Sequence, residues 1–264
     1  MPSFLNNTFA SFYNRILQFG HAGNNGTPTS TTAIQSGDGV ATSVSLSDDV
    51  LSVQPQNDDS VGSLLCKNSG GSNILAVDTT NSKVLVGASQ VAVNTQYIHF
   101  SALSHTPLVG RHYPMGLGLA SFASAELSED VILGTGTDPA TTMDISAASS
   151  ESNVWVQCYW YLPDAITLDS AIVLSGGTSA SDSALNFHIM SYTLDISSNH
   201  GDLSEGVVVA DSSATSAIDE DVIKSTSLTI QSADIAAGKV LVATYESDSA
   251  HVTSSRMVVK YHIQ

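Results

Sequence analysis

Positive charge is the most evident shortage in this 264-residue sequence. Only 8 residues are Lys or Arg, against 25 Asp and Glu, and the formal net charge is −17 at pH 7. Proteins that bind nucleic acids or anionic membranes do so with clustered Lys and Arg. The eight cations are instead scattered along the chain. The composition therefore argues against nucleic-acid binding and against binding to an anionic membrane surface.

Cysteine and long apolar runs are also scarce. Cys66 and Cys158 are the only cysteines, and neither belongs to a CxxC motif. We expect two buried thiols rather than a disulfide, consistent with maturation in a reducing cytoplasm. No apolar run approaches the ~20 residues that span a bilayer, and the N-terminus lacks the basic region of a secretory signal.

The sequence motifs of common enzymes are missing as well. No phosphate-binding GxxxxGK[ST], no complete GxGxxG and no GxSxG nucleophile elbow occurs. These absences predict a protein that is not an enzyme and has neither catalytic nor cofactor-binding residues. A glycoside hydrolase stays open in principle, because folding alone decides whether two carboxylates face each other across a groove.

Histidines and acidic pairs are the remaining candidates for metal ligands. None of the eight histidines has HxH or HExxH spacing, and the nearest set is His105 and His112. This pair has two readings. It binds a metal, or it belongs to a loop that is ordered or contacts another subunit. Three acidic clusters, Asp48-Asp49, Asp58-Asp59 and Asp219-Glu220-Asp221, either bind Ca²⁺ or form solvated turns. Without EF-hand spacing we expect no metal site.

The first of three zones, residues 1–30, contains the only good helix candidate, Pro2–Gly20. Large apolar residues recur there with the spacing of one helix face: Leu5, Phe9, Phe12, Ile16 and Phe19. This stripe either packs on its own chain or docks into a neighbour. We favour docking or self-association, because the run Gly23-Asn24-Asn25-Gly26 is typical of a flexible connector.

The second zone, residues 31–95, predicts short strands separated by turn clusters. The strands are expected at Val40–Leu46, Val50–Gln54, Ser63–Cys66, Asn73–Asp78, Lys83–Gly87 and Val91–Asn94. Their apolar residues alternate but are small, so one chain would form only a thin core. Three chains around one axis would bury these faces, and we expect a trimeric β-stalk.

The third zone, residues 96–264, predicts a fuller β-domain. Alternating apolar residues and Gly, Ser, Asp and Asn loops favour an antiparallel β-sandwich that resembles a jelly roll. Its strands are expected at Tyr97–Leu103, Gly118–Ala123, Val154–Leu162, Ile166–Leu174, Leu185–Leu194, Gly206–Ala210, Ser227–Gln231, Val240–Tyr245 and Arg256–Ile263. The fold class is therefore all-β with one short N-terminal helix.

One surface of this third zone is a candidate for recognition. If Val154–Leu162 is a strand, its apolar face leaves Trp155, Gln157, Tyr159 and Tyr161 on the other side. Aromatic side chains beside polar ones form the centres of protein interfaces or stack on sugars. Three readings stay open for this face: a trimer interface, packing within the chain, or contact with a ligand.

Several segments resemble structural proteins of marine tailed bacteriophages. The run Gly62–Gly87, GSLLCKNSGGSNILAVDTTNSKVLVG, is similar to their stalk segments, as is Ser45–Gln56, SLSDDVLSVQPQ. Tyr161–Asp164, Leu185–Tyr192 and Val259–His262 resemble parts of appendage head domains. The resemblance covers most of the chain after Thr31. It implies a homotrimeric fibre, spike or decoration protein that attaches to the virion by its N-terminus.

Two classes of function follow. The favoured one is a non-enzymatic surface appendage of a virion, a head fibre, decoration protein or short tail fibre that is assembled in the host cytoplasm. The alternative is a receptor-binding tip that recognises a carbohydrate on the host surface. The resemblance supplies no catalytic residues and does not distinguish attachment to the capsid from attachment to the tail.

Overall fold

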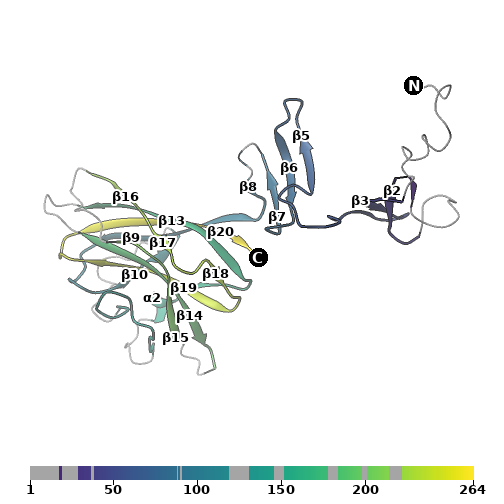
Figure 1. Cartoon of the computed structure of the whole chain (residues 1–264). Coiled ribbons are helices and arrows are strands. Elements are labelled where there is room, and N and C mark those ends of the chain that lie inside the picture. Colours follow the sequence, from purple (N-terminus) through teal and green to yellow (C-terminus); the bar gives the residue numbers. More distant parts are fainter. Residues whose placement is uncertain are drawn as a thin grey trace, which may run out of the picture. The chain divides into compact units, whose positions relative to one another are not determined.

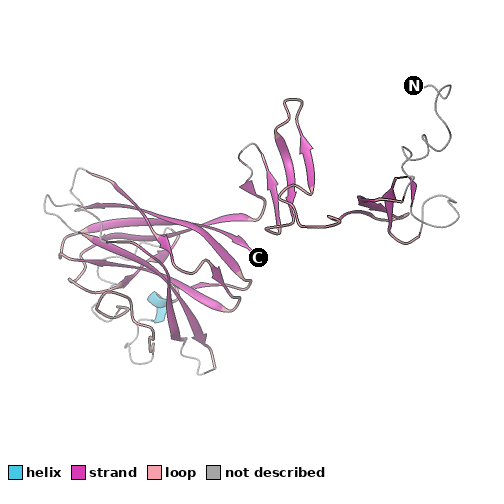
Figure 2. Ribbon diagram, viewed as in Figure 1, coloured by secondary structure: helices cyan, strands magenta, loops and turns pink. Residues whose placement is uncertain are grey.

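A computed structural model of the chain describes an all-β protein (Figure 2). It describes residues 18–19, 29–36, 39–87, 89, 91–118, 131–145, 152–177, 184–197, 201–213 and 222–264. The chain divides into two compact units, Met1–Val93 and Asn94–Gln264, which we call the N-terminal unit and the head unit. Among the described residues, no helix is long and apolar enough to cross a membrane.

The first sheet of the N-terminal unit has four antiparallel strands in chain order. They are β1 (Gln18–Phe19), β2 (Thr32–Gln35), β3 (Ala41–Leu46) and β4 (Leu51–Val53). Most of the helix predicted over Pro2–Gly20 lies outside the described residues. The prediction of a helix is wrong for its last part, because Phe19 is extended and pairs with Ile34 of β2. Backbone pairing with a strand therefore replaces the helical turn there.

The second sheet of this unit, which we call the β6 sheet, also has four antiparallel strands in chain order (Figure 1). They are β5 (Leu64–Lys67), β6 (Asn73–Asp78), β7 (Lys83–Val86) and β8 (Val91–Ala92). The short strands predicted in this zone are confirmed, and β6 has the predicted bounds. In the turn after β5, Asn68 Oδ1 accepts from the backbone N–H of Ser72 at 2.9 Å, and Gly71 has the positive φ of +83° that such a tight turn needs.

The head unit contains two facing six-stranded sheets, which form a sandwich-like arrangement (Figure 1). The first, the β14 sheet, contains β10 (Tyr113–Pro114), β19 (Lys239–Ser247), β14 (Leu185–Asp195), β15 (Asp202–Asp211) and β17 (Thr229–Ile230), with β12 (Trp160–Tyr161) beside β19. The second, the β20 sheet, contains β11 (Gly116–Leu117), β9 (Thr95–His105), β20 (Thr253–Ile263), β13 (Ile166–Gly177) and β16 (Lys224–Ser227), with β18 (Asp234–Ile235) beside β13. Every strand pairing in both sheets is antiparallel.

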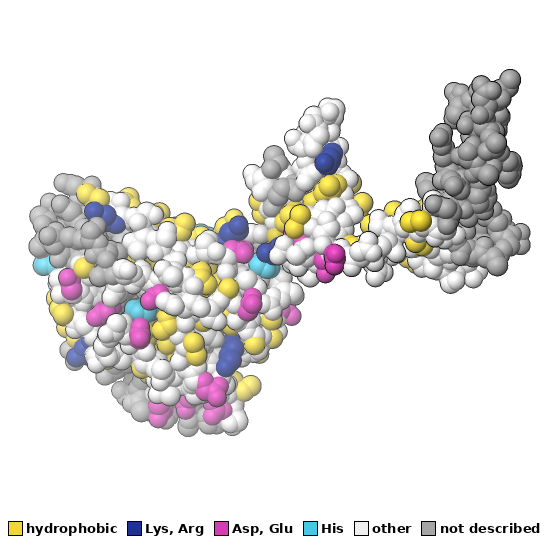
Figure 3. Space-filling model, in the orientation of Figure 1, with side chains coloured by type: hydrophobic (Ala, Val, Ile, Leu, Met, Phe, Trp, Pro, Cys, Tyr) yellow, Lys and Arg dark blue, Asp and Glu magenta, His cyan; other side chains and the backbone are white. Residues whose placement is uncertain are grey.

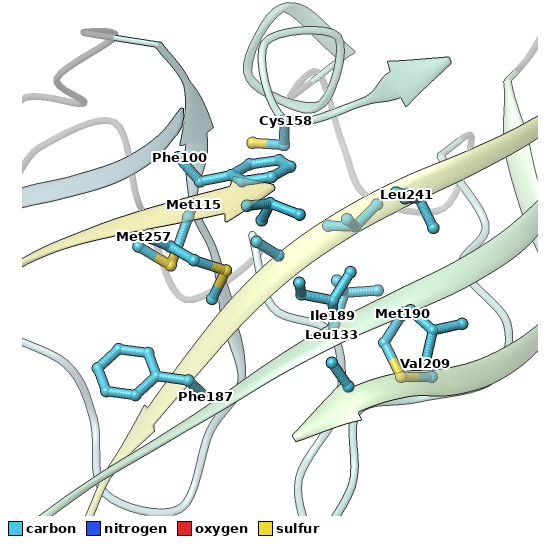
Figure 4. Close-up of a cluster of buried hydrophobic side chains, with 14 of the residues drawn as sticks. Phe100, Met115, Leu133, Cys158, Phe187, Ile189, Met190, Val209, Leu241 and Met257 are labelled. Atoms are coloured by element: carbon cyan, nitrogen blue, oxygen red, sulfur yellow. The ribbon is translucent and has the colours of Figure 1, made fainter. Parts of the chain in front are cut away.

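The core of the head lies between the two sheets (Figure 4). Phe100 and Met257 are paired neighbours in the β20 sheet, and Phe187 and Ile189 belong to the β14 sheet. All four side chains are fully buried. Full burial of a side chain of this size stabilises the fold by roughly 1.5–3 kcal/mol. This unit can therefore form its own core from a single chain.

The outer face of the β14 sheet is covered by the unit's own chain. The Tyr192 hydroxyl donates to the Ala140 carbonyl at 2.6 Å, and the Gly206 N–H donates to the Thr141 carbonyl at 2.8 Å. Segment 131–145 thus lies against this face. On β13 of the other sheet, Ile172 remains exposed. Within the described residues the two outer faces therefore differ, since Tyr192 is buried on one and Ile172 is exposed on the other.

The strand predicted over Val154–Leu162 is wrong. A single helical turn, α2 (Ser152–Trp155), occupies its start, and only Trp160–Tyr161 form a strand. Val154 and Cys158 are both buried, four residues apart, while Val156 between them is 67% exposed. A spacing of four residues suits a helical turn as well as a strand face. Of the strand predicted over Gly118–Ala123, only Gly118 lies within the described residues, where it is part of a turn.

Candidate functional site

The β6 sheet presents one face composed entirely of apolar side chains, which we call the apolar face. The pairing register places these side chains in two rows, Leu64–Val77–Val84 and Cys66–Leu75–Val86–Val91. Because side chains of a strand alternate between its two sides, both rows point to the same side of the sheet. The sequence predicted that apolar residues alternate along these strands, but the two rows follow only from the pairing.

None of the seven side chains of the apolar face is buried by the described residues. Leu64 is 41% exposed, Val84 37%, Val86 38% and Val91 40%. Figure 3 shows hydrophobic side chains at the surface of this part of the molecule. A soluble monomer rarely exposes a large contiguous apolar patch unless it is an interaction site. This face is therefore the strongest candidate for a protein–protein contact.

The opposite face of the β6 sheet is mixed. Asp78 and Lys83 are opposite each other in the register, on the other side from Val77 and Val84. Asp78 also accepts hydrogen bonds from the backbone N–H of Asn81 at 2.9 Å and from its side-chain amide at 2.8 Å. These bonds to Asn81 lower the pKa of the Asp78 carboxyl. The charges of this hairpin thus stay away from the apolar face.

The residues predicted to dock the N-terminus fall almost entirely outside the described part of the chain. Leu5, Phe9, Phe12 and Ile16 lie outside it. Phe19 is described only for its backbone, which pairs with Ile34. The docking interpretation for this stripe stays a prediction.

The aromatic residues predicted to share one strand face do not share one in the structure. Trp155 is 1% exposed in α2, and its ring lies against Tyr159, with centroids 6.2 Å apart. The Tyr159 hydroxyl donates to the Gly201 carbonyl at 3.2 Å, and burial raises the pKa of that hydroxyl. Tyr161 lies on β12 and is 54% exposed. Trp155 and Tyr159 thus pack within the unit, and Tyr161 does not join them.

The two histidines singled out by spacing have different partners. His105 Nδ1 forms a hydrogen bond with the Tyr245 hydroxyl, while His112 Nε2 donates to the Gly136 carbonyl at 2.9 Å. Both rings are buried. In the part of the chain that the structure describes, no group of three or more His, Cys, Asp or Glu residues is placed to hold a metal ion.

The acidic clusters that lie within the described ranges are at the surface. Asp48-Asp49 and Asp58-Asp59 are exposed, and the first pair lies in a turn where Ser47 Oγ accepts from the backbone N–H of Val50 at 3.0 Å. Asp219-Glu220-Asp221 lies outside the described residues.

One arrangement has no counterpart in the sequence analysis. Trp160 of β12 and Tyr261 of β20 meet edge to face, with ring centroids 4.8 Å apart, and line a hollow together with Gln96 and Asp164. The two residues are about one hundred positions apart in the chain. Nothing in the local pattern indicates that the two strands meet.

The two cysteines also differ from expectation in one respect. Both are free thiols, but only Cys158 is buried, whereas Cys66 is exposed on the apolar face. Burial raises the pKa of the Cys158 thiol. The prediction of two buried thiols is wrong for Cys66 in the single chain.

No protein-family model matches the sequence, and no curated protein matches it at a significant level.

Proposed function

We propose that this chain is a non-enzymatic structural protein of a tailed-bacteriophage virion and that it forms a homotrimer on the virion surface. The uncovered apolar face of the β6 sheet is the observation that carries the self-association. The resemblance of residues 45–56 and 62–87 and of three head segments to phage structural proteins supports a location on a virion. Assembly would occur in the host cytoplasm.

Other copies of the chain are the partner that best fits the apolar face. The chain carries a formal charge of −17, so two copies repel each other over most of their surfaces. The seven side chains of the apolar face carry no charge. Copies can meet there without burying an unpaired carboxylate, which would oppose association strongly.

A ring of three copies suits this sheet better than a pair. The opposite face of the sheet also has exposed apolar side chains, with Ile74 at 53% and Leu65 at 40%. A two-fold dimer buries the same face twice and leaves the other face in water. In a closed ring, the apolar face of one chain meets a different surface of the next, and three is the smallest such ring.

The remaining parts have roles in this arrangement. The stripe from Leu5 to Phe19 docks into another virion protein, the region 31–95 forms the trimeric β-stalk, and a jelly-roll-like head is displayed outward. The head unit buries its own core, so it folds independently of the number of chains. Head fibre, decoration protein and short tail fibre all fit this organisation.

Native mass spectrometry tests the trimer directly. We expect three times the chain mass for the wild-type protein. A double variant, Val84→Asp with Val86→Asp, places two charges on the apolar face and should give single chains with an unchanged thermal transition of the head unit. The matched control is Val207→Asp, at a site that is 56% exposed on β15, and it should remain trimeric. A wild-type monomer would exclude the proposal.

Incorporation into particles tests the virion assignment. A chain that lacks residues 2–20 should remain trimeric but should be absent from purified particles, because the docking stripe is missing. Cryo-microscopy of particles with the wild-type protein should show it at the surface. Normal incorporation of the truncated chain would refute the docking role of this stripe.

A further inference from the structure

A rigid hollow lies at one end of the head unit, where the loop after β12 approaches the ends of β9 and β20. It encloses about 130 Å³, and Trp160, Tyr261, Gln96, Pro163 and Asp164 are among its lining residues. Pockets for drug-sized ligands usually measure ~300–1,000 Å³. The hollow is therefore suited to one ring of a larger molecule.

Backbone hydrogen bonds fix the wall of this hollow. The Leu162 N–H donates to the Lys239 carbonyl at 2.9 Å, and the Gly238 N–H donates to the Leu162 carbonyl at 2.7 Å. The Gln264 N–H donates to the Ala165 carbonyl at 3.0 Å. Loop 162–166 is thus held on both sides by the sheets, and a ligand that enters the hollow has little chain to order.

Two aromatic rings form the apolar part of the hollow. Trp160 packs edge to face against Tyr261, with ring planes at 63°. The buried Phe100 also packs edge to face against Trp160, with ring centroids 6.2 Å apart. Both Trp160 and Tyr261 remain half-buried. Their uncovered surfaces can pack against the C–H groups of a flat, partly apolar ring.

The polar groups of the hollow are available for a ligand. The Tyr261 hydroxyl donates to Gln96 Oε1 at 2.8 Å, which orients the amide and leaves its Nε2 as a donor. Asp164 is exposed, and no hydrogen bond or ion pair joins it to another described residue. A carboxylate of this kind accepts two or more hydrogen bonds from neighbouring hydroxyl groups.

We infer that this hollow binds one neutral hexopyranose unit of a glycan. The C–H face of the sugar packs on Trp160 and Tyr261, and its hydroxyls donate to Asp164 and accept from Gln96. The charge of −17 and the Asp164 carboxylate repel an anionic sugar. This site goes beyond the proposed structural role and does not use Trp155 or Tyr159, which are packed within the unit.

Saturation-transfer difference NMR on the full chain tests the site, with the methyl glycosides of glucose, galactose and mannose as probes. At least one probe should receive saturation and titrate with a dissociation constant on the order of 1 mM, as expected for a single ring. Asp164→Asn should weaken that binding about tenfold or more, because the hydrogen bonds to a charged acceptor are lost. The exposed Tyr161→Phe on the same β12 strand is the control and should bind normally.

Each other outcome overturns the inference. No saturation of any neutral glycoside, equal binding by the Asp164→Asn variant, or a preference for sialic acid would each exclude a neutral-sugar site here. Capture of a peptide that contains no sugar by this hollow would do the same. The oligomeric mass of the Asp164→Asn variant should equal that of the wild type, so failure of this inference is distinguishable from failure of the trimer.

Discussion

The imidazole rings of His112 and His188 meet edge to face inside the head unit, with their centroids 5.1 Å apart. Both side chains are nearly inaccessible, and the Nδ1 atom of each is buried with no hydrogen-bond partner among the described residues. Burial first, and then the proximity of His112, lowers the pKa of His188. Asp138 and Asp211 act in the opposite direction but do not outweigh the burial.

This pair predicts that the head unit loses stability in weak acid. In the unfolded chain His188 is protonated near pH 6.5, whereas in the folded protein it is protonated only at a lower pH. The unfolded state therefore binds more protons in this range, and the free energy of unfolding decreases as the pH falls below about 6.5. Urea unfolding between about pH 8 and about pH 5 measures this slope.

Two variants separate His188 from other titrating groups. His188→Gln cannot gain a proton, so its free energy of unfolding should change less with pH than that of the wild type. His99→Gln removes an exposed histidine on β9 and should keep the wild-type slope. The same pH slope in His188→Gln and the wild type would show that this pair is not the acid-sensitive element.

Gly206 predicts a second effect on stability, this time from steric contact. A Cβ at this position would lie 2.5 Å from Tyr192 Cε1 and 2.7 Å from the Thr141 backbone Cα. Gly206→Ala should therefore lower the free energy of unfolding by about 1–3 kcal/mol, because segment 131–145 must move away from β15. Thermal or urea unfolding measures the change.

Gly176→Ala is the matched control for that substitution. Among the described residues, a Cβ there would meet only the Val222 carbonyl oxygen, at 4.0 Å, so the free energy of unfolding should change by no more than about 0.5 kcal/mol. Equal effects of the two substitutions would mean that segment 131–145 does not pack closely on this sheet.

Truncation of Trp155 and truncation of Tyr161 should have very different effects on the free energy of unfolding. Trp155→Ala removes a fully buried indole and should lower the free energy of unfolding by about 3–5 kcal/mol. Tyr161→Ala removes a side chain that is 54% exposed, and a change within about 0.5 kcal/mol is expected. Equilibrium denaturation of both variants gives the comparison. A stable Trp155→Ala protein would contradict the packing of α2 against the core.

Local sequence patterns predicted most strands because alternation reports which side chains face a core. The bounds of β6 agree fully, and alternation along β20 holds at Met257 and Val259, which are buried while their neighbours in the strand are only partly buried. The pattern failed at Val154–Leu162. A strand face and a helical turn both repeat at a spacing of four, so Val154 and Cys158 fit either structure.

Contacts between distant strands could not be predicted from such patterns. Trp160 reaches Tyr261 because pairing places β12 and β20 in their sheets. His112 reaches His188 because the adjacent β10 pairs with β19, and β19 pairs with β14. Local periodicity contains no information on which strands pair. The apolar face of the β6 sheet is an intermediate case, since the alternation was visible but the alignment of its rows depends on the register of three strand pairs.

The two thiols provide a probe of assembly, because they differ in what protects them. Cys158 is fully buried inside the head unit, so only unfolding exposes it. Cys66 is exposed in the single chain but lies in the second row of the apolar face. In the proposed trimer that row is covered by a neighbouring copy.

Thiol titration with a chromogenic disulfide reagent should therefore count no fast-reacting thiol in the assembled wild-type protein. The Val84→Asp, Val86→Asp double variant should expose one, Cys66, because its chains are separate while its head unit stays folded. Denaturant should expose both thiols in either protein. Adding Cys66→Ser to the double variant identifies the fast-reacting thiol. The fast phase of the titration should then disappear. If Cys66 reacts quickly in a wild-type protein of trimeric mass, the contact between copies lies away from this face.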